Sequence, residues 1–109
     1  MDARSSVSVI ITTHNRAAIL PRAIESVLPQ LRPGDELFVV DDGSTDGTAQ
    51  AVEPYLDRLR FLTQANQGPG AARNLGIESS SGDYVTFLDD DDQYLPGRAR
   101  EIPALTREA

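Results

Sequence analysis

Along this chain, short unbroken runs of apolar residues alternate with segments in which apolar residues recur every three or four positions. Unbroken runs of β-branched and aliphatic residues at 7–12 (VSVIIT), 36–40 (ELFVV) and 84–88 (YVTFL) are typical of strands buried on both faces, and 60–63 is a weaker run of this kind. Between the runs, apolar residues recur every three or four positions, as in amphipathic helices. The alternation predicts an α/β fold: a parallel four-stranded open sheet with helices on both faces and right-handed crossovers.

Proline and glycine mark where the predicted helices begin and end. Pro21 is suited only to the first turn of the first helix, because it lacks a backbone N–H. Pro54 is expected to kink or split the second helix for the same reason. Residues 68–70 (GPG) lead into a third helix, which residues 79–82 break. Pro96 is expected to open a last helix that runs toward the end of the chain.

Size and composition restrict the function classes. A chain of 109 residues allows one domain, with residues 1–6 expected to be extended or disordered and residues 7–109 folded. No apolar run approaches the roughly 20 residues of a membrane helix, and the start of the chain has no signal-peptide core. The lack of cysteine fits a cytoplasmic location, with membrane association of a parent protein left open. A net charge of -7 argues against a nucleic-acid partner.

The distinctive polar residues follow the carboxyl ends of predicted strands. Thr12 and His14 follow the first strand, Asp41 and Asp42 follow the second, and the run Asp89–Asp92 follows the fourth. In open α/β sheets, ligands bind at this edge, at the point where the strand order reverses. A merely solvated acidic surface would scatter its acids over helix faces as well. Their grouping at one edge therefore favours a binding site.

The run Asp89–Asp92 would let several carboxylates meet one cation from a single loop. Oxygen ligands suit Mg²⁺ or Mn²⁺, and magnesium usually takes one or two carboxylates together with phosphate oxygens of a substrate. A diphosphate leaving group needs such a counter-charge, because negative charge builds on it as its bond breaks. A solvated acidic loop is the alternative, and the position directly after a buried strand disfavours it.

Three further groups have both a functional and a structural interpretation. An ionised carboxylate of Asp41 or Asp42 could accept a hydrogen bond from a uracil-type N–H or from ribose hydroxyls. The structural interpretation is that one of these aspartates only forms an Asx-turn or caps the following helix. Arg73, near the start of the third helix, could meet a phosphate or form an ion pair with the acidic edge. His14 fits a polar loop residue or a stacking contact to a base better than a general base.

Four motifs in order, VSVIITTHNR, ELFVVDDGSTDGT, NQGPGAARNLGI and GDYVTFLDDDD, cover the chain from about Val7 to Pro96. Together they resemble the N-terminal, nucleotide-sugar-binding half of family-2 glycosyltransferases, which have the Rossmann-like GT-A fold. The resemblance implies transfer of a sugar from a nucleotide-diphosphate donor, expected to be UDP-linked, to an acceptor hydroxyl. It implies a metal-assisted inverting displacement with Mn²⁺ or Mg²⁺, and leaves open whether the acceptor is a glycan, a lipid or a protein.

The resemblance also implies site residues. Nucleotide-binding roles fall on Thr12, His14, Asp41, Asp42, Arg73 and Asp90. Within this set, Asp42 would contact the base with Asp41 in support, and Asp90 would lie near the ribose. Metal ligation falls on Asp89 and Asp91, with the register open by one residue because Asp92 departs from the commoner family pattern.

The family's domain is longer than this chain and carries its acceptor site and general base in a C-terminal half. No catalytic base is expected here, since Glu101 and Glu108 fall on the surface of the predicted last helix. The sequence therefore predicts a truncated donor-binding part that binds its donor weakly and turns over poorly. Its uncovered sheet edge is expected to allow self-association.

Three alternatives compete with this interpretation. The segment from Asp42 to Gly47, followed by Glu53, matches the spacing of a calcium-binding EF-hand loop, although a strand rather than a helix precedes it. Gly68-x-Gly70 resembles a dinucleotide-binding turn, but Arg73 replaces the third glycine. The third alternative is a non-catalytic interaction domain that keeps the fold without the chemistry.

Overall fold

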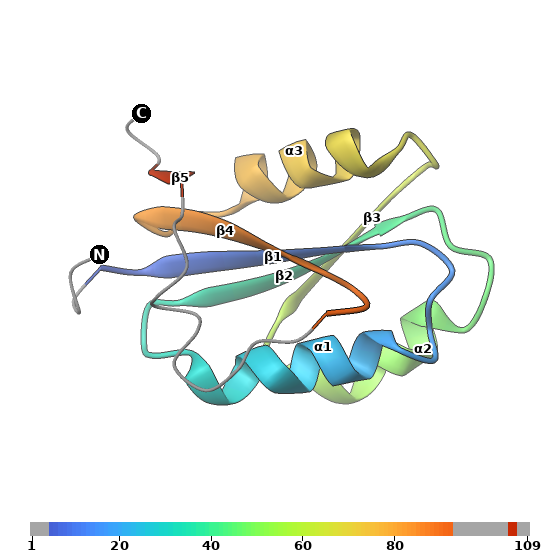
Figure 1. Ribbon diagram of the computed structural model, residues 1–109, viewed down its shortest axis with the longest axis horizontal. Coiled ribbons are helices and arrows are strands. Elements are labelled where there is room, and N and C mark those ends of the chain that lie inside the picture. Colours follow the sequence, from blue (N-terminus) through green and yellow to red (C-terminus); the bar gives the residue numbers. More distant parts are fainter. Residues whose placement is uncertain (1–4, 93–104, 107–109) are drawn as a thin grey trace.

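The computed structural model describes residues 5–92 and 105–106, so residues 1–4 of the predicted N-terminal extension lie outside this description. One sheet with the strand order β3-β2-β1-β4-β5 forms the centre of the molecule (Figure 1). Four of its strands run parallel, as the sequence predicts: β1 (Val7–Thr13), β2 (Glu36–Asp42), β3 (Arg60–Gln64) and β4 (Tyr84–Asp89). Strand β2 is two residues longer than predicted, so Asp41 and Asp42 belong to the strand itself.

The outer edge of β4 is paired with a short antiparallel strand, β5 (Leu105–Thr106). The sequence pattern placed these two residues in a terminal helix, and that prediction is wrong at 105–106. The remaining part of the predicted helix, 96–104 and 107–109, lies outside the described residues. Pairing satisfies backbone N–H and C=O groups that an edge strand otherwise leaves open, which explains why a strand forms beside Tyr84 and Val85.

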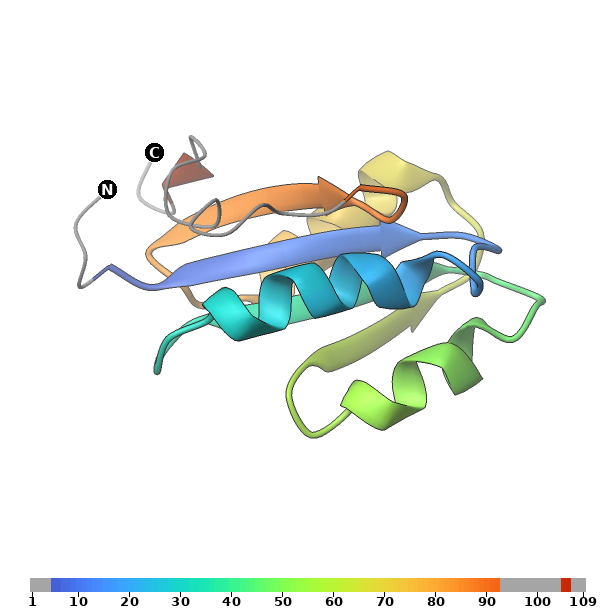
Figure 2. The same cartoon turned by 60° about the horizontal axis from the view of Figure 1, so that its bottom comes forward.

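Helices cover both faces of the sheet, as predicted. Helices α1 (Leu20–Val27) and α2 (Thr48–Val52) lie on one face, and α3 (Pro69–Ser79) lies on the other (Figures 1 and 2). Two short 3-10 turns follow the first two helices: η1 (Leu28–Gln30) and η2 (Glu53–Tyr55). Pro21 occupies the first turn of α1, and α2 ends at Val52, directly before the 3-10 turn η2 that contains Pro54, so both proline predictions are confirmed. Among the described residues, none of the helices has the length and apolar character that crossing a bilayer demands.

Alternate residues of β1 enter two separate hydrophobic cores. Val9 and Ile11 pack with α1 and α2, whereas Ile10 packs with α3 and Phe38 on the opposite face. Gly76 of α3 lies against Ile10, and a Cβ added there would be 2.7 Å from Ile10 Cγ2. The absence of a side chain at this position therefore lets α3 pack closely onto the sheet.

The topology brings the predicted site residues to one edge. Because β1, β2 and β4 are parallel, their carboxyl ends coincide, and the register pairs Thr12 with Asp89 and Thr13 with Asp41. From β1 the chain proceeds to β2 and β3 on one side, and β4 returns to the other side of β1. The strand order thus reverses between β1 and β4, which is where ligand sites form in open α/β sheets.

Candidate functional site

A cavity of about 270 Å³ opens at the carboxyl edge of the sheet. It is lined by Thr12, Thr13, His14, Arg16, Asp42, Pro69 and Asp90. These residues come from the end of β1 and the loop after it, the end of β2, the turn after β4 and the start of α3. Residues 42 and 90, which are far apart in the sequence, therefore border the same space. Of the predicted nucleotide-binding residues, Thr12, His14, Asp42 and Asp90 line the cavity, and their roles as ligands stay predictions.

The carboxylate of Asp42 is a fixed acceptor on the wall of the cavity. It is 6% exposed and accepts hydrogen bonds from the Gln64 side-chain amide (2.8 Å) and from the backbone N–H groups of Gln67 (2.7 Å) and Gly68 (2.9 Å). These bonds, the Gln64 amide first, lower the pKa of Asp42 and keep it ionised. A carboxylate has about four acceptor positions, so roughly one position, on Oδ2, is left for a ligand.

Asp41 has a different environment from its neighbour, because successive strand residues point to opposite sides. Its carboxylate accepts hydrogen bonds from the backbone N–H of Ser44 (3.1 Å) and from the Ser44 hydroxyl, and it does not line the cavity. This is the turn-forming arrangement that the sequence left open for one of the two aspartates. A supporting role of Asp41 in nucleotide binding stays a prediction.

The ring of His14 lies at the cavity, in polar contact with Asp42, Asn15 and Asn66. Nδ1 lies 2.8 Å from the backbone carbonyl of Asp42, and Nε2 lies 3.3 Å from the side-chain amide of Asn15. The side-chain amide nitrogen of Asn66 lies 3.3 Å from Nδ1 and 3.5 Å from Nε2. A carbonyl can only accept, so the shorter contact with Asp42 favours the proton on Nδ1 and leaves Nε2 as the acceptor from Asn15. Because both ring nitrogens have polar partners, this geometry favours His14 as a residue of the cavity wall over His14 as a general base.

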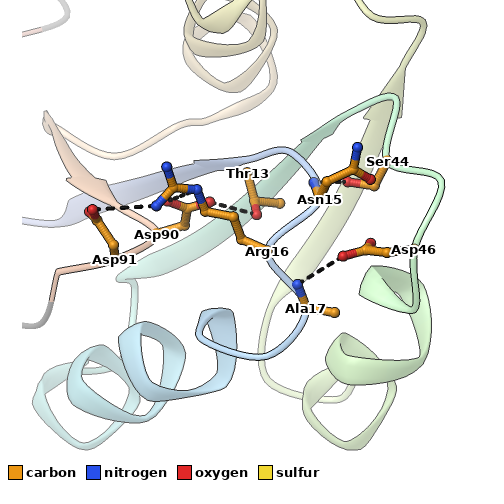
Figure 3. A network of polar contacts seen from close by, with 8 residues as sticks. All are labelled: Thr13, Asn15, Arg16, Ala17, Ser44, Asp46, Asp90 and Asp91. Atoms are coloured by element: carbon orange, nitrogen blue, oxygen red, sulfur yellow. Dashed lines mark hydrogen bonds and ion pairs between the residues drawn. The ribbon is translucent and has the colours of Figure 1, made fainter.

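Two loops at this edge are joined to each other by hydrogen bonds. The backbone N–H of Asn15 donates to the Ser44 hydroxyl, and the Asn15 side-chain oxygen accepts from the backbone N–H of Thr45, both at 2.8 Å. The backbone N–H of Ala17 donates to Asp46 at 3.1 Å (Figure 3). Asn15 has a φ of 52°, a conformation that asparagine tolerates better than most residues. The loop after β1 is thus fixed on both sides of residue 16.

Asp46 is expected to contribute acid-sensitive stability through these contacts. Its carboxylate accepts hydrogen bonds from the Thr48 hydroxyl and from the backbone N–H groups of Ala17 and Thr48, and these bonds, the Thr48 hydroxyl first, lower the pKa of Asp46 below 3.8. A carboxyl whose pKa is lower in the folded than in the unfolded state adds stability that is fully present above the unfolded-state pKa. This stability is lost as the pH falls through the folded-state pKa. In thermal melts between pH 3 and 7, Asp46→Ala should lower Tm at pH 7 and flatten its acid dependence. Asp57→Ala, at an exposed aspartate, is the control, and identical curves for both variants would contradict the assignment.

The contacts of Asp46 also bear on the calcium-loop alternative. Asp46 bonds to Ala17 and Thr48, whereas Asp42 bonds to residues 64–68, so the two carboxylates do not converge on one ion. A strand, β2, precedes the segment, where an EF-hand requires a helix. Loss of stability in Asp46→Ala is therefore expected without calcium.

Asp90 and Arg16, which also line the cavity, form a second group of polar contacts. Figure 3 shows these contacts together with Thr13 and Asp91. Asp90 is 9% exposed and accepts a hydrogen bond from the Thr13 hydroxyl at 2.9 Å. Arg16 Nε lies 3.8 Å from Asp90 Oδ1, and Arg16 Nη1 lies 3.4 Å from Asp91 Oδ2. Burial raises the pKa of Asp90, while Thr13 and Arg16 act in the opposite direction. Arg16 and Thr13 line the cavity although the sequence pattern assigned no role to either.

The predicted metal ligands flank Asp90: Asp89 is the last residue of β4, and Asp91 lies in the turn that follows. Asp89 is exposed, and the Asp91 side chain is 57% exposed. Within residues 5–92, no group of three or more His, Cys, Asp or Glu side chains is arranged to hold an ion. Mg²⁺ needs only one or two carboxylates when phosphate oxygens complete its shell. The carboxylates of Asp89–Asp91 are donors of the type that such an ion takes, and the cationic Arg16 lies beside Asp90 and Asp91.

Arg73 does not belong to this arrangement. It is exposed on α3, does not line the cavity, and takes part in none of the ion pairs found between described residues. Its approach to phosphates stays a prediction. Arg16 is the arginine that lies beside the acidic residues, and its position two residues after His14, at the edge that gathers both acidic clusters, was the available signal.

Comparison with known sequences identifies the family and relatives of this chain. The sequence profile described as glycosyl transferase family 2 matches residues 8–104. An uncharacterized glycosyltransferase from Nostoc sp. is 42% identical over 100 residues, which cover 88% of this chain and 31% of that protein. A GalNAc(5)-diNAcBac-PP-undecaprenol beta-1,3-glucosyltransferase from Campylobacter jejuni is 41% identical over 96 residues, which cover 84% of this chain and 31% of that protein. The chain thus spans about a third of the length of these curated relatives.

Solved structures share the fold. TarS 1-349 from S. aureus, in complex with UDP-GlcNAc, superposes with a TM-score of 0.73 at 35% identity, covering 81% of this chain and 27% of that one. The mannosyltransferase PcManGT from Pyrobaculum calidifontis, in complex with GDP-Man and Mn²⁺, superposes with a TM-score of 0.75 at 29% identity. This match covers 87% of this chain and 30% of the mannosyltransferase. With the family profile matched over most of its length and this parallel sheet, the chain belongs to glycosyl transferase family 2 and has a GT-A fold.

Proposed function

We propose that this chain forms the donor-binding part of a glycosyltransferase, which moves a sugar from a nucleotide-diphosphate sugar to an acceptor hydroxyl. The observation that carries the proposal is the position of Asp42 and Asp90 on one cavity at the strand-order reversal. A nucleotide placed there would have an ionised acceptor at one end and the acidic loop after β4 at the other. The solved relatives in complex with UDP-GlcNAc and GDP-Man support a donor of this class.

The hydrogen bonding of Asp42 supports uridine as the base. Three of its roughly four acceptor positions are used by Gln64, Gln67 and Gly68. The N–H of uracil needs one acceptor, whereas the paired N–H donors of guanine need two. A base with a single donor therefore fits the remaining capacity of Asp42 better.

We place Mn²⁺ or Mg²⁺ at Asp89 and Asp91, with Asp90 near the ribose. The ion supplies positive charge that stabilises the diphosphate as the bond to the sugar breaks. Asp42 and Asp90 would hold and orient the donor, so that an acceptor hydroxyl could attack the anomeric carbon from the face opposite the diphosphate and invert its configuration. We place the general base outside residues 5–92, because the carboxylates beside the cavity are assigned to the nucleotide and the ion.

Metal-dependent binding of UDP is the expected result for this site. In calorimetry at pH 7, Mn²⁺ should strengthen UDP binding by on the order of tenfold, about 1.4 kcal/mol, because the diphosphate otherwise faces unscreened carboxylates. GDP should bind more weakly than UDP, and NADH should not bind. The double variant Asp89→Asn/Asp91→Asn should lose the effect of Mn²⁺, while Asp57→Asn, far along the chain in an exposed turn, should keep it.

The opposite results identify the alternatives. NADH binding without UDP binding would favour the dinucleotide-binding domain. Unchanged metal and nucleotide binding in the double variant would favour the non-catalytic domain.

A further inference from the structure

We propose that Arg16 is a placeholder cation: it pairs with Asp90 and Asp91 in the donor-free chain, and turns to the diphosphate when the donor and its metal ion bind. This inference rests on the proposed function, and assigns a phosphate-binding, positioning role to a residue outside the predicted site. It commits to a nucleoside diphosphate with a divalent cation as the ligand that moves the side chain.

The guanidinium of Arg16 is loosely held. Its contacts with Asp90 and Asp91 measure 3.8 and 3.4 Å, whereas charge-assisted hydrogen bonds of this kind are about 2.7–2.9 Å. The side chain is 48% exposed, so solvent gives it room to turn. Neither contact is the bidentate pairing in which arginine binds a carboxylate most strongly.

The backbone of Arg16 is firmly held in contrast. Its carbonyl accepts hydrogen bonds from the N–H groups of Ile19 (3.1 Å) and Leu20 (3.0 Å) at the start of α1. Its neighbours Asn15 and Ala17 are bonded to the loop after β2. A fixed backbone with a loosely held guanidinium lets the charged group change partner without rearrangement of the loop.

The charge balance favours that exchange. Asp90 is 9% exposed, and burying an ionised carboxylate is costly without a cation nearby, which explains the position of Arg16. A divalent ion beside Asp89–Asp91 would supply that charge and repel the guanidinium. The diphosphate offers the planar fork of arginine a bidentate partner within the cavity that Arg16 already lines.

Two opposite effects follow from this exchange. Arg16 competes with a metal ion that arrives alone, because both need the carboxylate of Asp91 and their positive charges repel each other. Arg16 assists a metal ion that arrives with a diphosphate, because the guanidinium then has a new partner. A residue with only a structural role would change both affinities in the same direction.

The test measures two affinities of the full 109-residue chain by calorimetry: that of Mn²⁺ alone, and that of UDP at saturating Mn²⁺. In Arg16→Ala, Mn²⁺ alone should bind about three- to tenfold more tightly, and UDP should bind about tenfold more weakly. Arg16→Lys keeps the charge without the fork, so Mn²⁺ should bind as in the wild type while UDP is weakened. Arg58→Ala removes the same charge from the turn before β3 and should leave both affinities unchanged.

The outcomes separate this inference from the proposed function. If the wild type binds UDP with Mn²⁺ but Arg16→Ala weakens both affinities or neither, the placeholder role is wrong and donor binding stands. If the wild type binds neither Mn²⁺ nor UDP, the proposed function is wrong and the placeholder role falls with it. Circular dichroism of each variant verifies that the fold is retained.

Discussion

Replacement of Asp42 by alanine is expected to lower the free energy of unfolding by roughly 2–4 kcal/mol and to abolish UDP binding. The carboxylate is 6% exposed and holds three donors, from Gln64, Gln67 and Gly68. Without it, two backbone N–H groups lose their partners, and the segment 64–68 keeps, as attachments to β2, only the pairing of β3 with β2 and the hydrogen bond from the Asn66 amide to the backbone carbonyl of residue 42. Urea denaturation at pH 7 measures the stability, and calorimetry measures the binding.

The decrease in the free energy of unfolding caused by Asp42→Ala should also depend on pH. Because its hydrogen bonds lower the pKa of Asp42 below 3.8, its contribution is present above that value and disappears as the pH falls through the folded-state pKa. The difference between the wild type and Asp42→Ala should therefore shrink toward pH 3. Asp57→Ala, which removes an exposed carboxylate, should leave the stability near that of the wild type. An Asp42→Ala protein as stable as this control would show that the hydrogen bonds do not hold the loop.

Replacement of Gly43 by alanine is expected to destabilise the same edge of the sheet by roughly 3 kcal/mol or more. Gly43 has a φ of +76°, a conformation that side chains disfavour, and an added Cβ would lie 2.8 Å from the backbone nitrogen of Asn66. Because the clash is with backbone, relief requires the 64–68 segment to shift. That shift would break its bonds to Asp42, so UDP binding should weaken as well.

Gly34→Ala is a matched control for this variant. Gly34 has a φ of +95°, but an added Cβ would meet only the Ser6 side chain, at 3.9 Å. The free energy of unfolding of Gly34→Ala should fall only by the cost of holding alanine at a positive φ, about 1–2 kcal/mol. Urea denaturation of the two variants separates conformational strain from the clash. Equal losses in both would mean that the close approach to Asn66 has no energetic consequence.

The sequence alone determined the architecture and the edge at which the site lies. Unbroken apolar runs such as 36–40 specify buried strands, and the helical spacing between them specifies crossovers, so a parallel sheet follows. Pro21 and Pro54 set a helix start and a helix break through local backbone chemistry. Parallel strands place all carboxyl ends together, which is why Asp42 and Asp90 could be expected near each other.

Only the tertiary structure decided which polar side chains share a partner. Asp41 and Asp42 are chemically identical in sequence, yet one forms a turn with Ser44 and the other holds residues 64–68, because the pleat points them to opposite sides. Arg16 reaches Asp91 across 75 positions of the sequence, and also contacts Asp90, because two loops fold onto one edge of the sheet. Periodicity and propensity are local, whereas such pairings depend on long-range packing that residue spacing does not encode.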